Sequence, residues 1–445
     1  MNKTRIKKLN NIKIANEIKG NVVYWMHRDH RILDNNTLIA SLKTAKKHNV
    51  KVEIIFSLRK SFLKSMAVYK DLMLKGLEEV KVLAAKNNIK FTLISNLENQ
   101  EKMVVDYLKI NKSSFLFTDF TPLKTNRKWV KNVIKNVNIP AYEVDSRNII
   151  PVWLTSEKEE FAAYTIRPKI YNKLSEYLDK FDNSNLVNIK YSKESPQNKA
   201  LITLQNFIKN KLIHYADKRN SINKNLQSNL SKYLHFGHIS SQTTVLEVLK
   251  QTKISKDIFI NIKTNKAKII KENEVTLQES AFAFIEELVV RRELAENYCY
   301  YNKNYDNPKG YHEWAKKTHL EHKNDRRQYN YSLEKLEQYK THDDVWNKAT
   351  KEMIKTGKMH GYLRMYWAKK VLEWTPSVKI AHKYLIYLND KYMLDGRDPN
   401  GYTGIAWSVG GVHDRAWFER DIFGKIRYMN YEGLKRKFDL KKYLS

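Results

Sequence analysis

The sequence predicts a protein in two parts, an α/β domain built on a doubly wound parallel sheet and an all-α domain that follows it. Two observations favour this fold class. Between residue 21 and residue 146, short apolar runs alternate with helical patterns of about ten residues or more, which is typical of βαβ units. From Ala200 onward the pattern becomes helical. We expect an α/β domain at 1–150, a linker at 151–199 and a helical domain at 200–445.

Five apolar runs are the expected strands of the sheet. They lie at 22–26, 50–58, 89–95, 113–120 and 139–146. Helices are expected between them, at about 34–49, 61–87, 97–110 and 123–136. Asp34 is the expected N-cap of the first helix. The polar segment 27–35 follows the first strand, at the edge where such sheets bind ligands. It has no G-x-G-x-x-G pattern, so the usual dinucleotide-binding interpretation fails, and a charged loop is expected there.

The helical half contains a strong amphipathic helix at 280–301. Phe284 and Leu288 share one of its faces. Glu287 precedes Arg291 by four residues, a spacing that is typical of a surface salt bridge worth about 0.3–0.5 kcal/mol. Glu287 becomes a functional candidate only if it faces a cavity.

A second helical pattern places an arginine among aromatic residues. One helical face is formed by residues at alternating spacings of four and three, namely His360, Arg364, Trp367, Val371 and Trp374. Such a face is normally core, but a buried Arg364 needs an acidic partner. The nearest candidates downstream are Asp390, Asp395 and Asp398. Upstream, Thr341 is the expected cap of the helix that contains Trp346.

Glycine is concentrated in one stretch, 389–438. Six of the chain's 13 glycines lie between Gly396 and Gly424, together with acids, arginines, Trp407 and Trp417. Glycine lets the backbone approach another group closely. The stretch is therefore interpreted either as a shaped pocket or as a glycine-rich connection packed on helices, and Trp417 is expected in the core.

A cluster of small polar residues, Ser228, Asn229 and Ser231, precedes another apolar stretch. Such side chains cap helices, and the backbone N–H groups at a helix start also bind phosphate. An ordinary N-cap is the more common of these two roles.

The net charge of the chain is +33, and its pI is near 9.7. A chain this basic attracts polyanions, nucleic acid first, although an AT-rich genome also produces a lysine-rich composition. Cys299 is the only cysteine, which excludes internal disulfides and a cysteine-cluster metal site. The chain has no apolar run long enough for a membrane span and no secretory signal. We therefore expect a soluble intracellular protein of the cytoplasm, the nucleus or a viral factory.

Long segments, collinear from residue 22 to residue 440, resemble the class II cyclobutane pyrimidine dimer photolyases of the photolyase/cryptochrome group. They read VVYWMHRDHRILDN, SNLSKYLHFGHIS, EELVVRRELAENYCYY, THDDVWNKATKEMIKTGKMHGYLRMYWAKKVLEWT, YLNDKYMLDGRDPNGYTGIAW and GGVHDRAWFERDIFGKIRYMNYEGLKRKFD. The main mismatch is the Lys/Asn-rich segment 250–278. The resemblance implies a Rossmann-like antenna domain, a helical FAD-binding domain and light-driven DNA repair without a metal. In that repair, reduced FAD donates an electron to a flipped-out dimer.

The resemblance also implies roles for individual residues. The FAD phosphates would be cradled by Tyr215, Ser228, Asn229, Leu230 and Ser231. The flavin ring would face the Arg364–Asp395 salt bridge, with Asn389 or Asn400 near its N5 atom. The dimer and the DNA would contact Glu287, Met365, Trp407, Arg219 and Arg427. Electrons would pass from the surface to the flavin through Trp374, Trp346 and Trp367, in that order.

Two other functions compete with repair. The first is a cryptochrome-like photoreceptor, but such proteins usually carry a C-terminal extension, and this chain ends at Ser445 directly after the helical domain. The second is a flavin-free structural protein that binds nucleic acid through its charge alone. The resemblance also allows a deazaflavin-type antenna chromophore in the α/β domain. We expect a monomer that acts on UV-damaged DNA.

Overall fold

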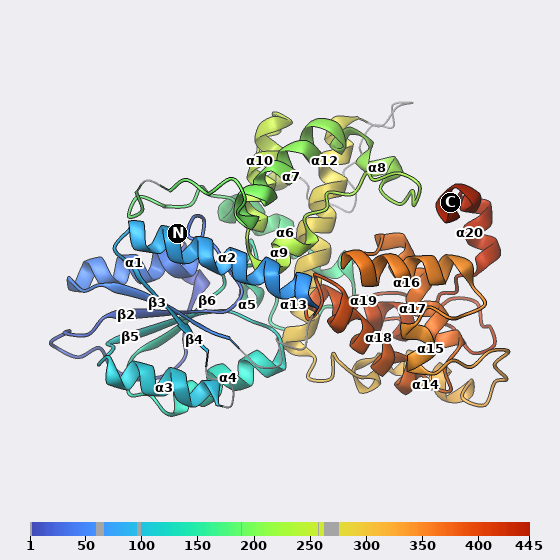
Figure 1. Cartoon of the computed structure of the whole chain (residues 1–445), viewed down its shortest axis with the longest axis horizontal. Helices are drawn as coiled ribbons and strands as arrows, with labels where there is room; N and C mark the ends of the chain where they lie inside the picture. The colour runs from blue at the N-terminus through green and yellow to red at the C-terminus, as the bar shows by residue number, and fades with distance from the viewer. Residues whose placement is uncertain (1, 59–65, 96–98, 188, 257, 262–275) are drawn as a thin grey trace. The chain divides into compact units, whose positions relative to one another are not determined.

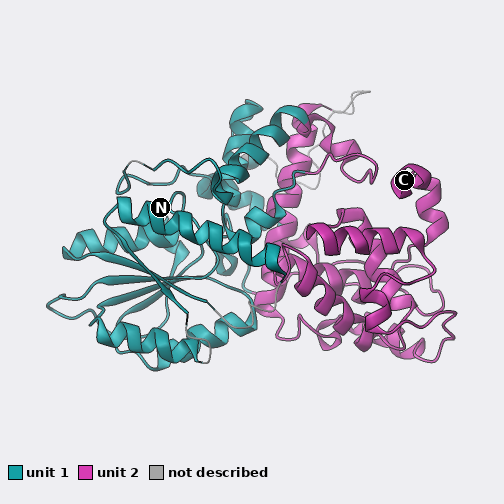
Figure 2. Cartoon of the chain, in the orientation of Figure 1, with its two compact units in different colours: residues 1–157, 167–210, 228–269 teal, residues 158–166, 211–227, 270–445 magenta. Residues whose placement is uncertain are grey.

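The structure is a computed structural model that describes residues 2–58, 66–95, 99–187, 189–256, 258–261 and 276–445. The chain forms two compact units that interleave along the sequence (Figure 2). Unit 1 consists of Met1–Glu157, Arg167–Asn210 and Ser228–Ile269, and unit 2 consists of Lys158–Ile166, Lys211–Gln227 and Ile270–Ser445. The predicted domains are contiguous segments of the chain, whereas each unit combines several segments. The two divisions are not equivalent, and the predicted domain boundaries stay a prediction.

Unit 1 is built on a six-stranded sheet in the order β1-β6-β5-β2-β3-β4. Its strands are β1 (Ile6–Lys8), β2 (Val22–Met26), β3 (Val52–Ser57), β4 (Lys90–Ile94), β5 (Phe115–Asp119) and β6 (Ala141–Val144). All neighbours pair in parallel except β1, which runs antiparallel to β6 at the edge. The five predicted strands and the α/β fold class are confirmed. Strand β1 is not predicted from the sequence, because its three residues, Ile-Lys-Lys, form no apolar run.

Helices cover both faces of this sheet (Figure 1). They are α1 (Asn36–His48), α2 (Ala67–Lys86), α3 (Gln100–Ile110) and α4 (Lys124–Lys135). The N-cap of α1 is Asn35, whose side chain accepts a hydrogen bond from the Leu38 N–H. The predicted cap, Asp34, instead binds the side chains of Asn183 and Thr243. Part of the predicted helix 61–87 lies outside the described residues.

The core between the sheet and α3 and α4 is apolar. Val23 and Trp25 of β2 and Leu116 of β5 pack with Val104 of α3 and Val133 of α4, and all five are buried. Burial of aliphatic side chains like these contributes about 1.5–3 kcal/mol each. The alternating apolar pattern therefore produces the layered unit that the sequence predicts.

The rest of unit 1 is helical. Its further helices are α5 (Val152–Thr155), α7 (Pro196–Asn210), α9 (Ser231–Phe236), α10 (Ser241–Gln251) and α11 (Ile258–Asn261). Helix α6 (Ala163–Tyr177) lies inside the predicted linker and contains Pro168, and its residues from Arg167 onward belong to unit 1. Most of the Lys/Asn-rich segment 250–278 lies outside the described residues.

Unit 2 is all-helical, as predicted. Its longer helices are α12 (Leu277–Ile285), α13 (Arg292–Tyr301), α14 (Glu313–Glu321), α16 (Asp344–Thr356), α17 (Gly361–Glu373), α18 (Val378–Tyr392) and α19 (Pro399–Gly410). Its shorter helices are α8 (Tyr215–Lys218), α15 (Leu333–Glu337), α20 (Tyr431–Lys437) and α21 (Leu440–Leu444). Among the described residues, no helix is long and apolar enough to cross a membrane.

The predicted helix 280–301 is interrupted at its centre. Residues Glu286–Arg291 form a π-helical turn between α12 and α13, and such turns frequently occur at functional sites. The start of α12 is fixed by a reciprocal capping box between Thr276 and Glu279.

The predicted cap of α16 is wrong by two residues. Asp343 caps the helix by accepting from the Trp346 N–H at 2.8 Å. Thr341 bonds instead to the side chain of Asn347 at 2.8 Å.

Candidate functional site

The candidate site in unit 2 is built where α17, α18 and α19 pack together. Arg364 of α17 forms an ion pair with Asp395, which follows α18, at 2.6 Å. The two side chains are 29% and 13% exposed. The other two candidate partners are occupied, since Asp390 accepts from the Tyr402 hydroxyl at 2.9 Å and Asp398 caps α19. The partner of Arg364 is thus one of the three acids expected from the sequence, Asp395, although Arg364 is only partly buried.

The two predicted asparagines have different surroundings. Asn389 is buried near the end of α18, and its Nδ2 donates to Asp390 Oδ1 at 2.9 Å. A Cβ atom on Gly401 would lie 2.9 Å from Asn389 Nδ2, so glycine at this position lets α19 approach the amide. Asn400 is exposed, and its Nδ2 donates to Asp398 Oδ1 at 3.0 Å.

Three buried indoles form a continuous series through α16 and α17. The ring centroids of Trp367 and Trp346 are 6.3 Å apart and nearly parallel at 11°. Those of Trp346 and Trp374 are 5.6 Å apart at 68°. Trp346 also donates from Nε1 to the Trp367 carbonyl oxygen at 3.1 Å. Trp346 is thus the middle member, as predicted, but Trp374 is only 1% exposed, so the predicted surface end of the series is buried.

The π-helical turn presents Glu287 to α8 rather than to its own helix. Arg219 approaches Glu287 at 3.6 Å, with 30% and 42% of the two side chains exposed. Arg291 pairs with Glu286 at 3.7 Å, so the expected Glu287–Arg291 salt bridge is absent from the described ion pairs. The Arg219 guanidinium lies over the ring of Tyr215, with its Cζ atom 5.6 Å from the ring centroid. Burial and the Glu287 charge raise the pKa of Tyr215, which keeps the phenol neutral.

Two basic side chains lie near Trp407, a predicted contact of the dimer. Lys369 Nζ lies 5.3 Å and the Arg427 guanidinium 5.6 Å from its ring. Asp414 accepts from Arg427 at 2.8 and 3.0 Å. Trp417 is 37% exposed and lies 4.2 Å from the same guanidinium, so its predicted core position is wrong. In the sequence, arginines stand close to Trp417 on both sides, and this pattern favours the stacking of a guanidinium on an indole ring.

Lys369 is a member of this cluster that the sequence analysis missed. It is fully buried, and its Nζ donates to the Ser408 carbonyl oxygen at 2.8 Å. Burial lowers the pKa of Lys369 to about 7, against the opposing effect of Asp414. Lys369 follows Trp367 by two residues and stands directly beside Lys370, so the sequence alone does not distinguish the fully buried lysine from its neighbour. Met365, on the same helix, is partly buried.

The segment Ser228–Ser231 belongs to unit 1 and begins α9. Leu230 occupies the N-cap position, and no side chain caps this helix. Asn229 adopts a left-handed backbone conformation with φ 61°. Ser228 Oγ accepts from the Leu230 N–H at 3.5 Å. The N-cap interpretation of this polar cluster is therefore wrong, and the phosphate interpretation stays a prediction.

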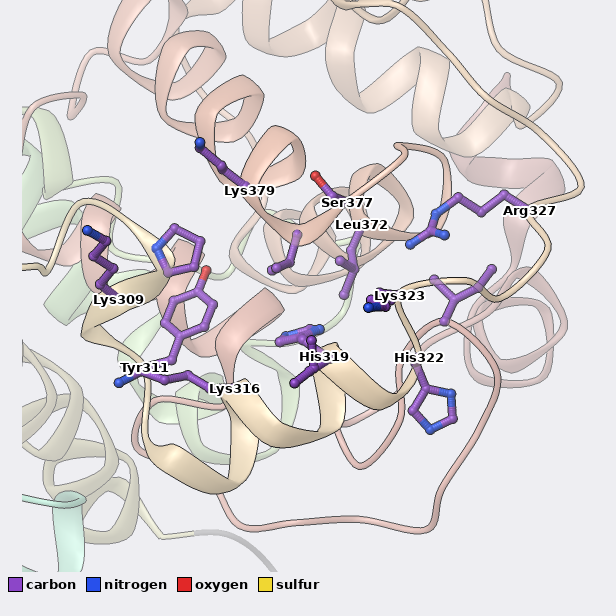
Figure 3. A pocket seen from close by; sticks show the side chains of 14 residues that line it. Lys309, Tyr311, Lys316, His319, His322, Lys323, Arg327, Leu372, Ser377 and Lys379 are labelled. Atoms are coloured by element: carbon purple, nitrogen blue, oxygen red, sulfur yellow. The ribbon is translucent and has the colours of Figure 1, made fainter.

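A cavity of about 610 Å³ lies elsewhere in unit 2 (Figure 3). Its basic lining residues are Lys309, Lys316, Lys323, Arg327 and Lys379. None of the residues predicted at the flavin or the dimer lines it, so it is separate from the candidate site. Among the described residues, no group of three or more His, Cys, Asp or Glu side chains could hold a metal ion.

Comparisons with known proteins give the family. A family model described as DNA photolyase matches residues 22–189. A deoxyribodipyrimidine photo-lyase of Potorous tridactylus is 40% identical, over 94% of this chain and 79% of the relative. A protein of the same name from Arabidopsis thaliana is 37% identical, over 99% of this chain and 91% of the relative. The chain belongs to the DNA photolyase family. The resemblance seen in the sequence motifs is thereby confirmed.

Solved structures show that the fold of this photolyase family member is shared with more distant proteins. A cryptochrome of Synechocystis matches 97% of this chain and 88% of its own, with a TM-score of 0.71 and 15% identity. A class III photolyase of Agrobacterium tumefaciens matches 97% of this chain and 87% of its own, with a TM-score of 0.67 and 17% identity. Identities this low establish the fold alone. The α/β and helical fold classes are thus both confirmed.

Proposed function

We propose that this chain is a deoxyribodipyrimidine photo-lyase that repairs cyclobutane pyrimidine dimers in DNA with an electron from reduced FAD. One observation carries the proposal. Helix α17 holds Arg364, paired with Asp395 at 2.6 Å, three residues from Trp367, the first of three buried indoles in series. A cofactor that is reduced by light needs polar groups beside its ring. It also needs a series of oxidisable side chains that leads to that ring.

The residues present fit a flavin. The isoalloxazine ring has a polar edge that needs hydrogen-bonding groups, and its protein partners tune its electronics. The partly exposed Arg364–Asp395 pair and the buried amide of Asn389 supply such groups. On the exposed turn of α19, a Cβ atom on Gly404 would meet no atom within 4 Å, which leaves open space beside these helices. The chemistry of this group of donors therefore suits the cofactor that the family implies.

Individual roles follow from this fit. Arg364 and Asp395 would face the flavin ring. Asn389 is buried and Asn400 is exposed, so we assign the hydrogen bond near N5 to Asn389. Tyr215 and the Ser228–Ser231 segment would hold the phosphates. When bound and excited, reduced FAD supplies one electron to the dimer and takes it back after the two C–C bonds have split.

The chain's own residues would handle the DNA. A net charge of +33 attracts the phosphate backbone, and Arg219 and Arg427 would lie at the mouth of the site. The dimer is poorly stacked, so flipping it out of the duplex costs only a few kcal/mol. Trp407 and Met365 would pack against the flipped bases. Glu287 would hydrogen-bond the dimer and stabilise the negative charge that develops on it.

The indole series would restore the reduced cofactor after oxidation. An electron that leaves Trp367 is replaced from Trp346, and that of Trp346 from Trp374, because adjacent rings lie within 6.3 Å. The deazaflavin-type antenna belongs to the proposal only as a second chromophore of the α/β domain. The absorption spectrum of the purified protein reports both chromophores.

Glu287→Ala tests the assignment of the site. The variant is expected to retain FAD and to repair dimers with a yield lowered by about tenfold or more, measured in pre-reduced protein under illumination. Tyr300→Phe, on the neighbouring helix α13, is the control and should repair like the wild type. Loss of FAD from Glu287→Ala would show that Glu287 is structural, and full repair would remove it from the site.

A further inference from the structure

The cavity of about 610 Å³ in unit 2 has no role in the proposed function. It is lined by α14 and the chain that follows it, by α17, and by the start of α18 (Figure 3). Its volume lies within the range of about 300–1,000 Å³ that is typical of small-molecule sites. The cavity therefore has room for a ligand of this class.

The wall of this cavity is largely apolar. Leu372 and Tyr311 are buried, and Ile422 is partly buried. Leu320 is 64% exposed although its side chain carries no polar group. A ligand that covered Leu320 would remove apolar surface from water, which stabilises a complex by about 25 cal/mol per Å². An apolar ligand body suits such a wall.

Two rings in the wall favour an aromatic ligand body. The centroids of Tyr311 and His319 lie 6.2 Å apart, with an angle of 44° between the rings. His319 Nε2 donates to the Val409 carbonyl oxygen at 2.7 Å. Burial lowers the pKa of His319 to about 4, so its ring is neutral at neutral pH. Neutral rings pack on a flat aromatic body in stacked or edge-to-face arrangements.

The cavity presents positive charge that has no acidic counterpart. No described Asp or Glu side chain lines it. Lys316 is paired with Glu313 at 2.8 Å. The other basic residues of the lining form no ion pair with a described residue, namely Lys309, Lys323, Arg327 and Lys379. Such a wall is complementary to an anion.

Arg327 distinguishes this cavity from ordinary basic surface. The chain has 81 basic and 48 acidic residues, so unpaired lysines at the surface would not by themselves indicate a site. Arg327 is partly buried, its Nε atom is buried without a hydrogen-bond partner, and Nη1 donates to the Asp325 carbonyl oxygen at 3.1 Å. Burial lowers the pKa of Arg327, against the opposing effect of Asp325. An acidic group in the cavity would supply the charge and the acceptor atoms that this guanidinium lacks.

The basic residues lie toward both ends of the cavity. Figure 3 shows Lys309 and Lys379 toward one end and Arg327 toward the other, with Leu372 between them. We propose that the cavity binds a small organic anion with an aromatic body and an acidic group, carboxylate or phosphate, at each end. Arg327 binds one acidic group, and Lys309 and Lys379 bind the other, through charge-assisted hydrogen bonds. The inference does not depend on the proposed function, because no residue assigned to the flavin or the dimer lines the cavity.

Titration calorimetry of the full chain tests the proposal. The probe is a naphthalene dicarboxylate with its acidic groups at opposite ends, in about 0.15 M salt, which screens weak attraction to exposed charges. We expect saturable binding of one probe per chain, a higher unfolding temperature with the probe, and no release of FAD. The dimethyl ester lacks the charges and adipate lacks the ring, so each should bind at least about tenfold more weakly. The corresponding naphthalene bisphosphate should bind at the same site, and the tighter of the two dianions identifies the preferred acidic group.

A matched pair of variants locates the probe. Arg327→Gln should raise its Kd by about tenfold or more, because a charge-assisted hydrogen bond is lost. Arg326→Gln removes the same charge from a neighbour that does not line this cavity, and it should bind like the wild type. Leu320→Glu adds a carboxylate to the wall at an exposed position. It should abolish binding while circular dichroism shows an unchanged fold.

Four results would overturn the proposal. Equal losses in Arg326→Gln and Arg327→Gln would show that the probe senses only general surface charge. Equal affinity for the ester or for adipate would show that the charges or the ring are not recognised. Release of FAD by the probe would place it in the flavin site. Displacement of the probe by a dimer-free DNA duplex would assign the cavity to a nucleic-acid interface instead.

Discussion

The pairing of Arg364 with an acidic residue could be predicted from the sequence. Arg364 lies on a helical face that is formed largely by aromatic side chains, and a buried guanidinium needs an acidic partner. The sequence alone therefore predicts that this partner is one of three aspartates downstream. The structure pairs Arg364 with Asp395 at 2.6 Å. The choice among the three depends on where α18 ends, which a helical pattern does not determine to a single residue.

Asp395→Asn tests the pair. We expect FAD binding about tenfold weaker, or about 1.4 kcal/mol, because Arg364 keeps a polar neighbour but loses its counter-charge. The partial exposure of both side chains keeps the loss below that of a fully buried pair. Equilibrium dialysis of FAD measures it. Asp106→Asn, in an exposed ion pair with Lys102 on α3, is the control, and an equal loss in that variant would contradict the assignment.

The buried Lys369 predicts a pH dependence of stability. Its pKa is lowered from 10.5 to about 7 in the folded chain, so between these values the unfolded chain binds a proton that the folded chain does not. The free energy of unfolding therefore rises with pH in this window, at most by about 1.4 kcal/mol per pH unit. Lys369→Met should lose this rise. Urea denaturation of both proteins from about pH 7 to about pH 10 measures it, and parallel curves would contradict the shift.

Near Trp407, the sequence predicts the wrong position for Trp417 and does not predict the burial of Lys369. Trp417 was expected in the core because tryptophan usually is, yet it stacks at 4.2 Å on Arg427 at the surface. Lys369 was overlooked because lysine is almost never fully buried. Ser408, the partner of Lys369, lies 39 residues away, and Arg427, the partner of Trp417, lies in the irregular segment that follows it. Hydrophobic patterning carries no information on either pair.

At the scale of elements, the sequence predicts existence better than detail. All five apolar runs became strands of one sheet. Three of them, β2, β3 and β5, are buried along nearly their whole length, and parallel strands that are buried on both faces read as continuous apolar runs. The edge strand β1 and the π-helical turn Glu286–Arg291 were not predicted. A three-residue edge strand leaves no pattern, and a π-helical turn preserves the helical one. Glu287 lies in that turn and approaches Arg219 at 3.6 Å.

Trp367→Phe tests the indole series that joins α16 to α17. Photoreduction should slow by about tenfold or more, because phenylalanine is much harder to oxidise than indole. Repair by pre-reduced protein should be unchanged, because in the proposed function the series only regenerates the cofactor and does not touch the dimer. Flash photolysis and a repair assay on the same preparation measure the two rates. Loss of repair in the pre-reduced variant would overturn this division of labour.

At the scale of the whole molecule, the net charge of +33 is its most prominent property. Charge alone predicts a polyanionic partner but not the chemistry performed on it. The two interleaved units also cannot be predicted from hydrophobic patterns along the chain. Unit 1 includes Ser228–Ile269, and unit 2 includes Lys211–Gln227, so each unit collects segments that are separated along the chain.

Arg427→Gln tests how this charge is used. In the described structure Arg427 binds Asp414 at 2.8 Å, so contact with DNA requires it to exchange a carboxylate for a phosphate. The slope of log K against log salt concentration should fall by about 1 when one phosphate contact is lost. Fluorescence anisotropy with dimer-containing DNA measures it. Lys102→Gln, on α3, should leave the slope unchanged, and an unchanged slope in Arg427→Gln would remove this residue from the interface.

The most direct test of the central claim is a repair assay on the wild type. Protein loaded with FAD and reduced is mixed with an oligonucleotide that contains one cyclobutane thymine dimer, and the dimer is quantified by chromatography after illumination and after an equal time in the dark. We expect the dimer to revert to two thymines in the light, with no change in the dark. Dimers that stay intact in the light, with FAD bound and reduced, would contradict the account.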